Sequence, residues 1–320
     1  MDPYLTRELS LSEASDRLER AGIRGRVIEA RACAGGVSNF NHQLVLADGS
    51  RLLLRTYRAR GPSADEGRRT ELAIDPVLSA FHIRAPHVVA APDGADFVLF
   101  EWLDGVRLRD AFAAESEPRR LERAWSETGR ALRIIHDLLP DAISGFVRDG
   151  GTAYAPDAWA ALHGRTMQKA AVTLVSKWLI SAGDARRIAD VAARAADLVG
   201  SWRPSLLHGD PHAANVLVRD SGSAWRLAGW IDWERACIAD AESDLATFDL
   251  FTRAQVGATP KAFWDGYGRA PEVSRFRFYQ LHMAVFLASL DQAQRLPPGR
   301  EARRLVTSSL GALLEGLRSN

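Results

Sequence analysis

The stretch LLHGDPHAANVLV, at residues 206–218, decides the fold and the chemistry of this chain. A short apolar run leads into a loop that contains Gly209 and Pro211 and that carries Asp210. Asn215 follows on the same loop, directly before a second apolar run. The pattern predicts a loop, held between buried segments, that presents a carboxylate and an amide side by side.

A second acidic residue returns to the same neighbourhood. The segment DSGS at 220–223 predicts a hairpin turn between strands at 215–219 and 226–233, and the second strand carries Asp232. Phosphoryl transfer needs such a set, because Mg²⁺ prefers hard oxygen ligands and the acceptor hydroxyl needs a carboxylate that takes its proton. Kinases combine the same parts in the same order.

HGD at 208–210 with Asn215, followed by IDWE at 231–234, resembles the signature of the aminoglycoside phosphotransferase and choline kinase-like superfamily, the phosphotransferase enzyme family. The resemblance extends from about residue 25 to about residue 290. It implies that Asp210 is the catalytic base and that Asn215 and Asp232 are Mg²⁺ ligands. It also implies an α+β, two-lobed, protein-kinase-like fold. The N-lobe, 1–103, is an antiparallel sheet with a helix that binds nucleotide, and the larger, mainly helical C-lobe, 104–320, holds the catalytic and acceptor sites.

The residues around the two motifs have supporting roles. We expect His208 to organise the loop by hydrogen bonding, whereas His212 either contacts substrate or fills the loop. Glu234 lies near a second metal or is solvated. Asp244 matches a family position with a structural role, in which a buried carboxylate braces the catalytic loop through backbone N–H groups.

The elements expected around these motifs follow from periodicity. Before the break at 102–105 we predict helices at 11–21 and 64–82 and strands at 27–33, 41–46, 51–57, 88–91 and 97–101. After it the chain is mainly helical, with helices at 184–199, 271–294 and 299–317.

The nucleotide site is predicted in the N-terminal half. In AGGVSN at 34–39, Gly35 and Gly36 let the backbone approach phosphates, and Ser38 and Asn39 can donate hydrogen bonds. Kinases place a lysine on the third strand, but the first half of this chain has none, and the matching residue is Arg55. Arginine keeps the charge and can bind phosphate through two nitrogens.

The remaining nucleotide contacts rest on the resemblance. Glu71, on the following helix, is the candidate partner of Arg55. The hinge lies at 100–103, where backbone groups of Glu101 and Leu103 face the purine of ATP or of GTP.

Composition limits the partners, the disulfide content and the location that we expect for this chain. The chain has 320 residues, 47% hydrophobic and 25% charged, with a net charge of +1, which fits a soluble protein of two lobes and does not point to nucleic acid or membrane partners. Cys33 and Cys237 are too few for a disulfide framework, and we expect free thiols. The N-terminus has no apolar signal region and no stretch is long enough to span a membrane, so we expect a cytoplasmic protein, monomeric or dimeric.

The function expected is Mg²⁺-dependent transfer of a γ-phosphate to a hydroxyl of a small molecule, plausibly an aminoglycoside or related antibiotic, as in resistance enzymes. Asp240, Glu242, Asp249 and Asp265 would suit a polycation, although basic residues lie in the same stretch. The first alternative is a kinase of a cellular metabolite such as choline, an amino alcohol or a sugar.

Two other classes stay open. His208, Asp210 and His212, with Asp232, can be interpreted as the ligand set of a metallohydrolase. That interpretation leaves Asn215 and the glycine loop without a role. A pseudokinase that only binds ligands is favoured by the arginine at position 55 alone.

Overall fold

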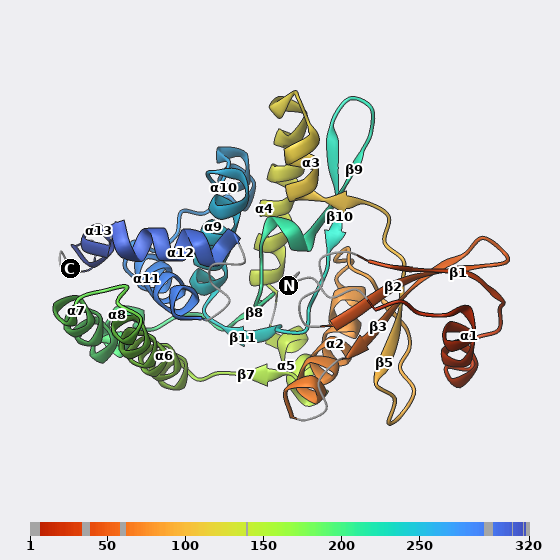
Figure 1. Cartoon of the computed structure of the whole chain (residues 1–320), viewed down its shortest axis with the longest axis horizontal. Coiled ribbons are helices and arrows are strands. Elements are labelled where there is room, and N and C mark those ends of the chain that lie inside the picture. The colour runs from red at the N-terminus through yellow and green to blue at the C-terminus, as the bar shows by residue number, and fades with distance from the viewer. Residues whose placement is uncertain are drawn as a thin grey trace.

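The computed structural model describes residues 7–33, 39–57, 62–138, 140–290, 297–308, 310–315 and 317. The fold is α+β, with an antiparallel sheet in the N-terminal part and a mainly helical remainder, which confirms the predicted fold class. The sheet lies at one end of the molecule, and the helices of the C-terminal half extend to the other end (Figure 1).

The N-terminal part is a five-stranded sheet with strand order β1-β2-β3-β5-β4 and antiparallel pairing throughout. A capping box between Ser10 and Glu13 begins its first helix. The predicted elements of this part are all present, with ends that differ by a few residues. Their bounds are α1 (Leu11–Arg20), β1 (Val27–Ala32), β2 (Asn39–Leu46), β3 (Arg51–Tyr57), α2 (Pro62–Ala80), β4 (Val88–Ala90) and β5 (Phe97–Glu101).

Strand β3 shows how the sheet positions its functional side chain. Successive residues of a strand point to opposite faces. Leu54 therefore packs into the apolar cluster beneath α1, whereas Arg55 points to the other face, toward α2. The alternation places a charged residue on the face that borders the rest of the molecule.

The C-terminal part is built from helices and two small three-stranded sheets, β10-β9-β6 and β7-β11-β8. The first strand after the N-terminal sheet, β6, pairs with β9, so the polypeptide has crossed into the second part by residue 106. The lobe boundary at 103 remains a prediction. The bounds are β6 (Val106–Arg107), α3 (Leu108–Ala114), η1 (Pro118–Leu121), α4 (Glu122–His136), α5 (Pro140–Arg148), β7 (Thr152–Ala153), α6 (Pro156–Ser176), α7 (Ala182–Ala193), α8 (Ala195–Val199), β8 (Ser205–Leu207), η2 (Ala213–Asn215), β9 (Val216–Asp220), β10 (Trp225–Trp230), β11 (Cys237–Ala239), α9 (Ala241–Val256), α10 (Lys261–Tyr267), α11 (Val273–Ser289), α12 (Pro297–Ser308) and α13 (Leu310–Glu315).

Several helices differ from the sequence prediction. The helix expected at 184–199 is two helices, α7 and α8, separated at Arg194. The one expected at 299–317 is α12 and α13, and the one expected at 271–294 is α11, with 291–296 outside the described residues. The sequence did not indicate α6 or α9. Residues 241–250 of α9 are all buried, so this helix has no amphipathic stripe to detect.

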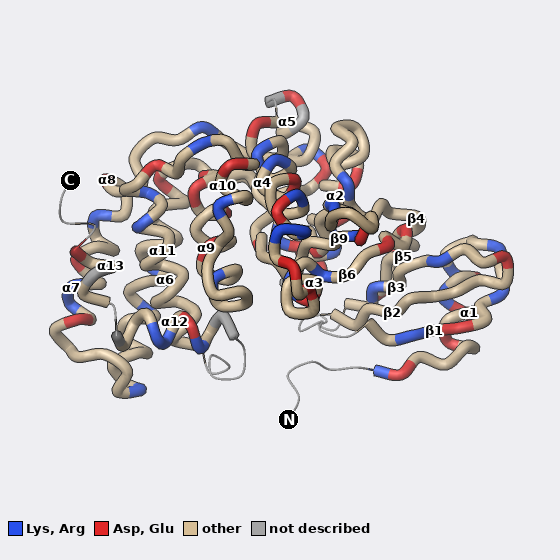
Figure 2. Tube along the Cα trace, turned by 90° about the horizontal axis from the view of Figure 1, so that it is seen from above, with Lys and Arg blue, Asp and Glu red and all other residues tan. Residues whose placement is uncertain are grey.

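Charged residues of both signs are interspersed along both parts of the molecule (Figure 2). Within the described ranges, no helix combines the length and apolar character that a membrane crossing requires.

A polar pair lies inside the helical core. The imidazole rings of His163, on α6, and His282, on α11, are buried with their centroids 4.2 Å apart. None of their ring nitrogens has a hydrogen-bond partner among the described residues. Burial lowers the pKa of His282 to about 4 and also lowers that of His163. Both rings are therefore neutral at physiological pH.

This pair predicts an acid-sensitive fold. The folded-state pKa of His282 lies below its unfolded value, so the unfolded chain binds the proton first, and stability is lost as pH falls from about 6.5 toward 4. Between pH 7.5 and pH 5, the unfolding free energy of wild type should fall by about 2 kcal/mol more than that of the His282→Phe variant. Urea unfolding at both pH values measures this. The exposed His82→Asn variant should behave like wild type, and an equal loss in His282→Phe and wild type would contradict the prediction.

Candidate active site

A buried carboxylate fixes the backbone of the loop that carries Asp210. Asp244, in the first turn of α9, accepts hydrogen bonds from the backbone N–H groups of His208 at 2.8 Å and Gly209 at 3.1 Å. The Nε2 atom of His136 lies 3.2 Å from the same carboxylate, in the core. The predicted brace by Asp244 is confirmed.

His208 connects this loop to the segment that carries Asp232. Its Nδ1 accepts the backbone N–H of Asp210 at 3.3 Å, so its Nε2 carries the proton and donates to the carbonyl of Ile231 at 3.0 Å. Burial lowers the pKa of His208, which keeps the ring neutral. The expected hydrogen-bonding role is confirmed, and both ring nitrogens are engaged.

The structure brings together the three residues that the motifs single out. The side-chain amide of Asn215 donates to the carbonyl of Asp210 at 3.0 Å, which leaves its Oδ1 as the outward oxygen. The Asn215 carbonyl accepts the N–H of Ile231 at 2.9 Å, next to Asp232. Asp232 has φ 71°, a left-handed conformation that ends strand β10 before the predicted residue 233.

The two carboxylates differ in their electrostatics. Burial raises the pKa of Asp210 to about 6, with Arg235 opposing the rise and Asp232 adding to it. Burial acts on Asp232 in the same direction, but the charge of Arg55, with smaller contributions from His208 and His212, outweighs it and lowers the pKa of Asp232. Two carboxylates of different basicity therefore lie close together.

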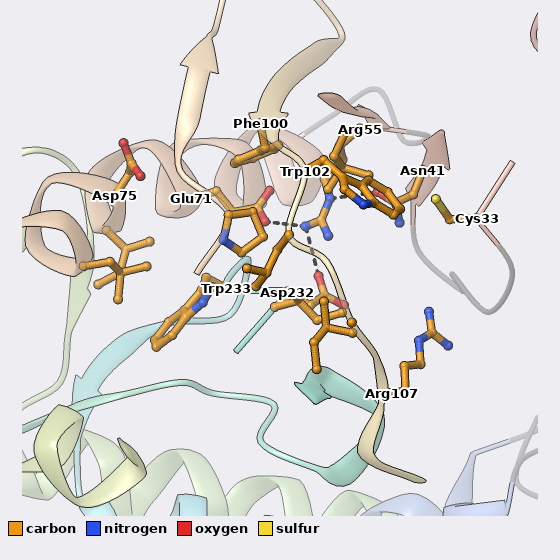
Figure 3. Close-up of a pocket in the computed structure, with 18 residues that line it drawn as sticks. Cys33, Asn41, Arg55, Glu71, Asp75, Phe100, Trp102, Arg107, Asp232 and Trp233 are labelled. Carbon is orange, nitrogen blue, oxygen red and sulfur yellow. Dashed lines mark hydrogen bonds and ion pairs between the residues drawn. The ribbon is translucent and has the colours of Figure 1, made fainter. Parts of the chain in front are cut away.

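Arg55 joins the N-terminal sheet to this centre (Figure 3). Its guanidinium forms a buried ion pair with Glu71 of α2, and it also donates to Asp232 Oδ1 at 3.0 Å. Tyr57 donates a hydrogen bond to the other oxygen of Glu71. Burial disfavours the charge of Arg55, but Glu71 and Asp232 outweigh it and raise its pKa. The Arg55–Glu71 pair is present, and its contact with nucleotide remains a prediction.

A cavity of about 220 Å³ opens beside Arg55 and Asp232. Leu103 lines it, as expected of the hinge. The backbone N–H of Glu101 is already used, because it donates to the carbonyl of His87 at 2.8 Å. Its carbonyl is therefore the group left for the predicted hinge contact.

The structure describes only the end of the glycine loop, at Asn39. Gly35, Gly36 and Ser38 lie outside the described residues. Asn39 begins β2, and its side-chain amide donates to Glu234 Oε2 at 2.5 Å, so the end of this loop touches the IDWE segment. Glu234 is half-buried between Asn39 and Gly67, and it is therefore not simply a solvated residue.

The cavity wall includes residues to which the sequence analysis gave no role of their own, among them Cys33, Trp102 and Arg107. The indole of Trp102 donates to Asp104 at 3.1 Å, and Arg51 holds that carboxylate with two bonds of 2.6 and 2.7 Å. Position next to the hinge was the only available signal for Trp102 and Arg107. Cys33 directly precedes the glycine loop.

The donor set fits Mg²⁺. Asn215 and Asp232 carry hard oxygen donors on adjoining segments, and Asp232 lines the cavity. A cation held by them would also offset the charge of the neighbouring Asp210 and Asp232. The zinc-type alternative does not fit. Both nitrogens of His208 are engaged, and His212 Nδ1 accepts the N–H of Ala214 at 3.1 Å. Within the described ranges, no three His, Cys, Asp or Glu side chains form a metal cluster.

This fold and site define a kinase-like phosphotransferase, and the comparison with family models agrees. The model described as the phosphotransferase enzyme family, APH, matches residues 29–279, well over half of the chain. The chain therefore belongs to this family, and it is an enzyme of the small-molecule phosphotransferase class, with an alcohol group as acceptor. A search of curated proteins gave no match.

Solved structures share the fold at low sequence identity. A macrolide 2′-phosphotransferase, MphH from Brachybacterium faecium, is 16% identical, with 93% of this chain and 98% of that chain covered and a TM-score of 0.62. The GDP complex of aminoglycoside 2′-phosphotransferase-IIIa is 14% identical, covers 95% and 99%, and has a TM-score of 0.69. ADP-bound aminoglycoside phosphotransferase APH(2″)-Ib is 15% identical, covers 96% and 98%, and has a TM-score of 0.63.

Gly209 gives a direct test of the loop geometry. It has φ 81°, and a Cβ there would lie 1.9 Å from the carbonyl oxygen of Arg235. Gly222 is a matched control, with φ 85° and nothing within 4 Å of the place that a Cβ would occupy. Gly222→Ala should cost about 1–2 kcal/mol of unfolding free energy from backbone strain alone. Gly209→Ala should cost at least about 2 kcal/mol more, from the displaced backbone. Equal losses in urea unfolding would show that the loop is not packed as described.

Proposed function

We propose that this protein uses Mg²⁺ to transfer the γ-phosphate of a nucleoside triphosphate to a hydroxyl group of a small molecule. The observation that carries the proposal is the convergence of Asp210, Asn215 and Asp232 beside a cavity that also contains Arg55. The metallohydrolase alternative is disfavoured because both ring nitrogens of His208 and Nδ1 of His212 are engaged in the loop.

Each residue has a defined task in this proposal. Asp210 orients the acceptor hydroxyl and takes its proton, and its raised pKa brings it closer to the working pH than an ordinary aspartate. Asn215 and Asp232 hold the metal. When bound, Mg²⁺ neutralises the charge of the transferred group. The neutral His208 keeps the segments of Asp210 and Asp232 in register through its two hydrogen bonds.

The donor nucleotide is ATP, with GTP as the other candidate. Arg55 faces the cavity with Glu71 behind it, which suits a guanidinium that orients the phosphates. Gly35, Gly36, Ser38 and Asn39 are proposed to cover them. Glu101 and Leu103 are proposed to meet the purine through their backbone. Solved structures of similar fold were determined with GDP and with ADP.

For the acceptor, the first class to test is an antibiotic, because the structures of similar fold include aminoglycoside and macrolide phosphotransferases. The protein would then act in antibiotic resistance. A cellular metabolite such as choline, an amino alcohol or a sugar is the alternative. We place the reaction in the cytoplasm, where nucleoside triphosphates are available, with a monomer or dimer as the working form.

Removal of the base should separate chemistry from binding. Asp210→Asn keeps the shape of the side chain but cannot accept the proton, so phosphoryl transfer should fall by about 10²–10⁴-fold. Affinity for Mg²⁺–ATP should stay within about threefold of wild type, because Arg55 and Asp232 are intact. Mass gain of one phosphate on an acceptor panel, with calorimetry for the nucleotide, measures both. Turnover equal to wild type on any accepted compound would refute the role of Asp210.

Replacement of the proposed metal ligand, Asp232, should instead weaken binding of the Mg²⁺–nucleotide complex. Asp232→Asn should weaken Mg²⁺–nucleotide binding at least about tenfold, while binding of the nucleotide without metal changes little. The matched control is Asp265→Asn, at an exposed aspartate paired with Lys261 on α10. Calorimetric titrations with and without Mg²⁺ test this, and an unchanged metal dependence would exclude Asp232 as a ligand.

A further inference from the structure

The carboxylates that would suit a polycationic acceptor are already paired. Asp240 accepts the N–H of Glu242 at 3.1 Å and the hydroxyl of Tyr279 at 3.1 Å. Asp249 accepts hydrogen bonds from Arg253, Gln280 and Thr259, all between 2.7 and 2.8 Å. Both side chains are buried, with exposed fractions of 3% and 8%. Neither can meet an ammonium group of a ligand without losing these partners.

Among the other acidic residues on this side, Glu242 keeps one oxygen without a hydrogen-bond partner among the described residues, but that oxygen is buried. The side chain of Glu242 is 3% exposed and faces Arg269 at 3.9 Å. Asp265 is exposed but forms two bonds with Lys261, on α10, which packs against α4 rather than against the catalytic loop. Asp244 is used by the loop itself. Of the acidic residues that the sequence suggested for a polycation, Asp240, Asp249 and Asp265 therefore have partners among the described residues, and Glu242 is buried.

Basic residues, by contrast, border the catalytic loop. The backbone carbonyl and Cβ of Arg235 lie directly against Gly209, and its side chain is exposed. Arg109 lies in the first turn of α3, and its side chain is 27% exposed. This helix packs against the η2 turn that ends at Asn215. Arg109 is paired with its neighbour Asp110 at 3.1 Å, on the surface. Both arginines place positive charge beside the position where an acceptor hydroxyl must reach Asp210.

An aromatic pair also borders the catalytic loop. The ring of His212 stacks on Phe251 of α9, with the planes at 8° and the centroids 5.1 Å apart. Because Nδ1 of His212 accepts the Ala214 N–H, its proton is on Nε2, which points toward Asp210 Oδ1 at 3.9 Å. Phe251 is partly exposed. This His212–Phe251 platform offers an uncharged face next to the base.

We infer that the acceptor of this enzyme carries at most one positive charge, and that its hydroxyl-bearing ring packs on the His212–Phe251 platform, next to the loop that Arg109 and Arg235 border. The inference rests on the proposed function and narrows its acceptor. Aminoglycosides carry several ammonium groups and need unpaired carboxylates nearby, whereas a neutral sugar or a macrolide with one amine does not. Arg109 and Arg235 act as specificity residues, because they repel polycations.

The experiment compares a polycation on wild type and on charge-reversed variants. Kanamycin is titrated calorimetrically into the full chain with Mg²⁺–ADP present, for wild type and for the double variant Arg109→Glu/Arg235→Glu. Wild type should bind kanamycin with a Kd no tighter than about 1 mM, and the double variant should bind it at least about tenfold more tightly. The gain should shrink with added salt, because it is electrostatic.

Two controls keep the result interpretable. Arg148→Glu reverses an arginine that is 77% exposed at the end of α5, and it should leave kanamycin binding as in wild type. If the double variant fails to bind Mg²⁺–ADP, the neutral single variants Arg109→Gln and Arg235→Gln replace it, with an expected gain of about threefold each. Micromolar binding of kanamycin by wild type, or equal affinity in wild type and the reversed variants, would overturn the inference.

A separate measurement tests the function on which the inference rests. Mg²⁺-dependent release of phosphate from ATP or GTP, with water as acceptor, should be present in wild type and lost in Asp210→Asn. If this activity is present and kanamycin binds tightly, the proposed function stands and the acceptor inference fails. If it is absent from wild type and no compound of the acceptor panel is phosphorylated, the proposed function itself fails.

Discussion

The buried carboxylate of Asp244 is the constraint on which the active site depends. It accepts the two backbone N–H groups that lead into Asp210, and it does so from the first turn of a helix whose residues 241–250 are all buried. A buried acceptor with several donors is costly to disturb, since each donor would be left without a partner. The loop therefore has a fixed path before any ligand binds, which is what catalysis by positioning requires.

Arg55 connects the N-terminal sheet to the C-terminal part of the molecule through ion pairs. It reaches from the central strand of the N-terminal sheet to Glu71 of α2 and to Asp232 of the hairpin segment. One guanidinium thus connects the cavity wall to Asp232, the proposed metal ligand. Because arginine is forked, it can contact both carboxylates at once, which the compact ammonium of lysine does less readily. The arginine at this position is compatible with an intact site and does not by itself indicate a pseudokinase.

The sequence predicted the convergence of the three motif residues better than it predicted the helices around them. Asp210, Asn215 and Asp232 lie in short motifs whose chemistry is local, and a hairpin of a few residues brings them together. Helix α9 was missed because burial on all sides removes the periodic signal, and Arg107 was missed because its place in the cavity depends on how β6 joins β9. The sequence also could not show that Asp240 and Asp249 pair with residues far away in the chain. Because these carboxylates are paired, their charge does not indicate a site for a polycationic acceptor.

The most direct test of the account is a crystal structure of the full chain with Mg²⁺ and a non-hydrolysable triphosphate. The account predicts that Asn215 Oδ1 and an oxygen of Asp232 lie about 2.1 Å from the metal, with the terminal phosphate facing Asp210 across the acceptor position. A metal bound without either residue, or a nucleotide held outside the cavity beside Arg55, would contradict it.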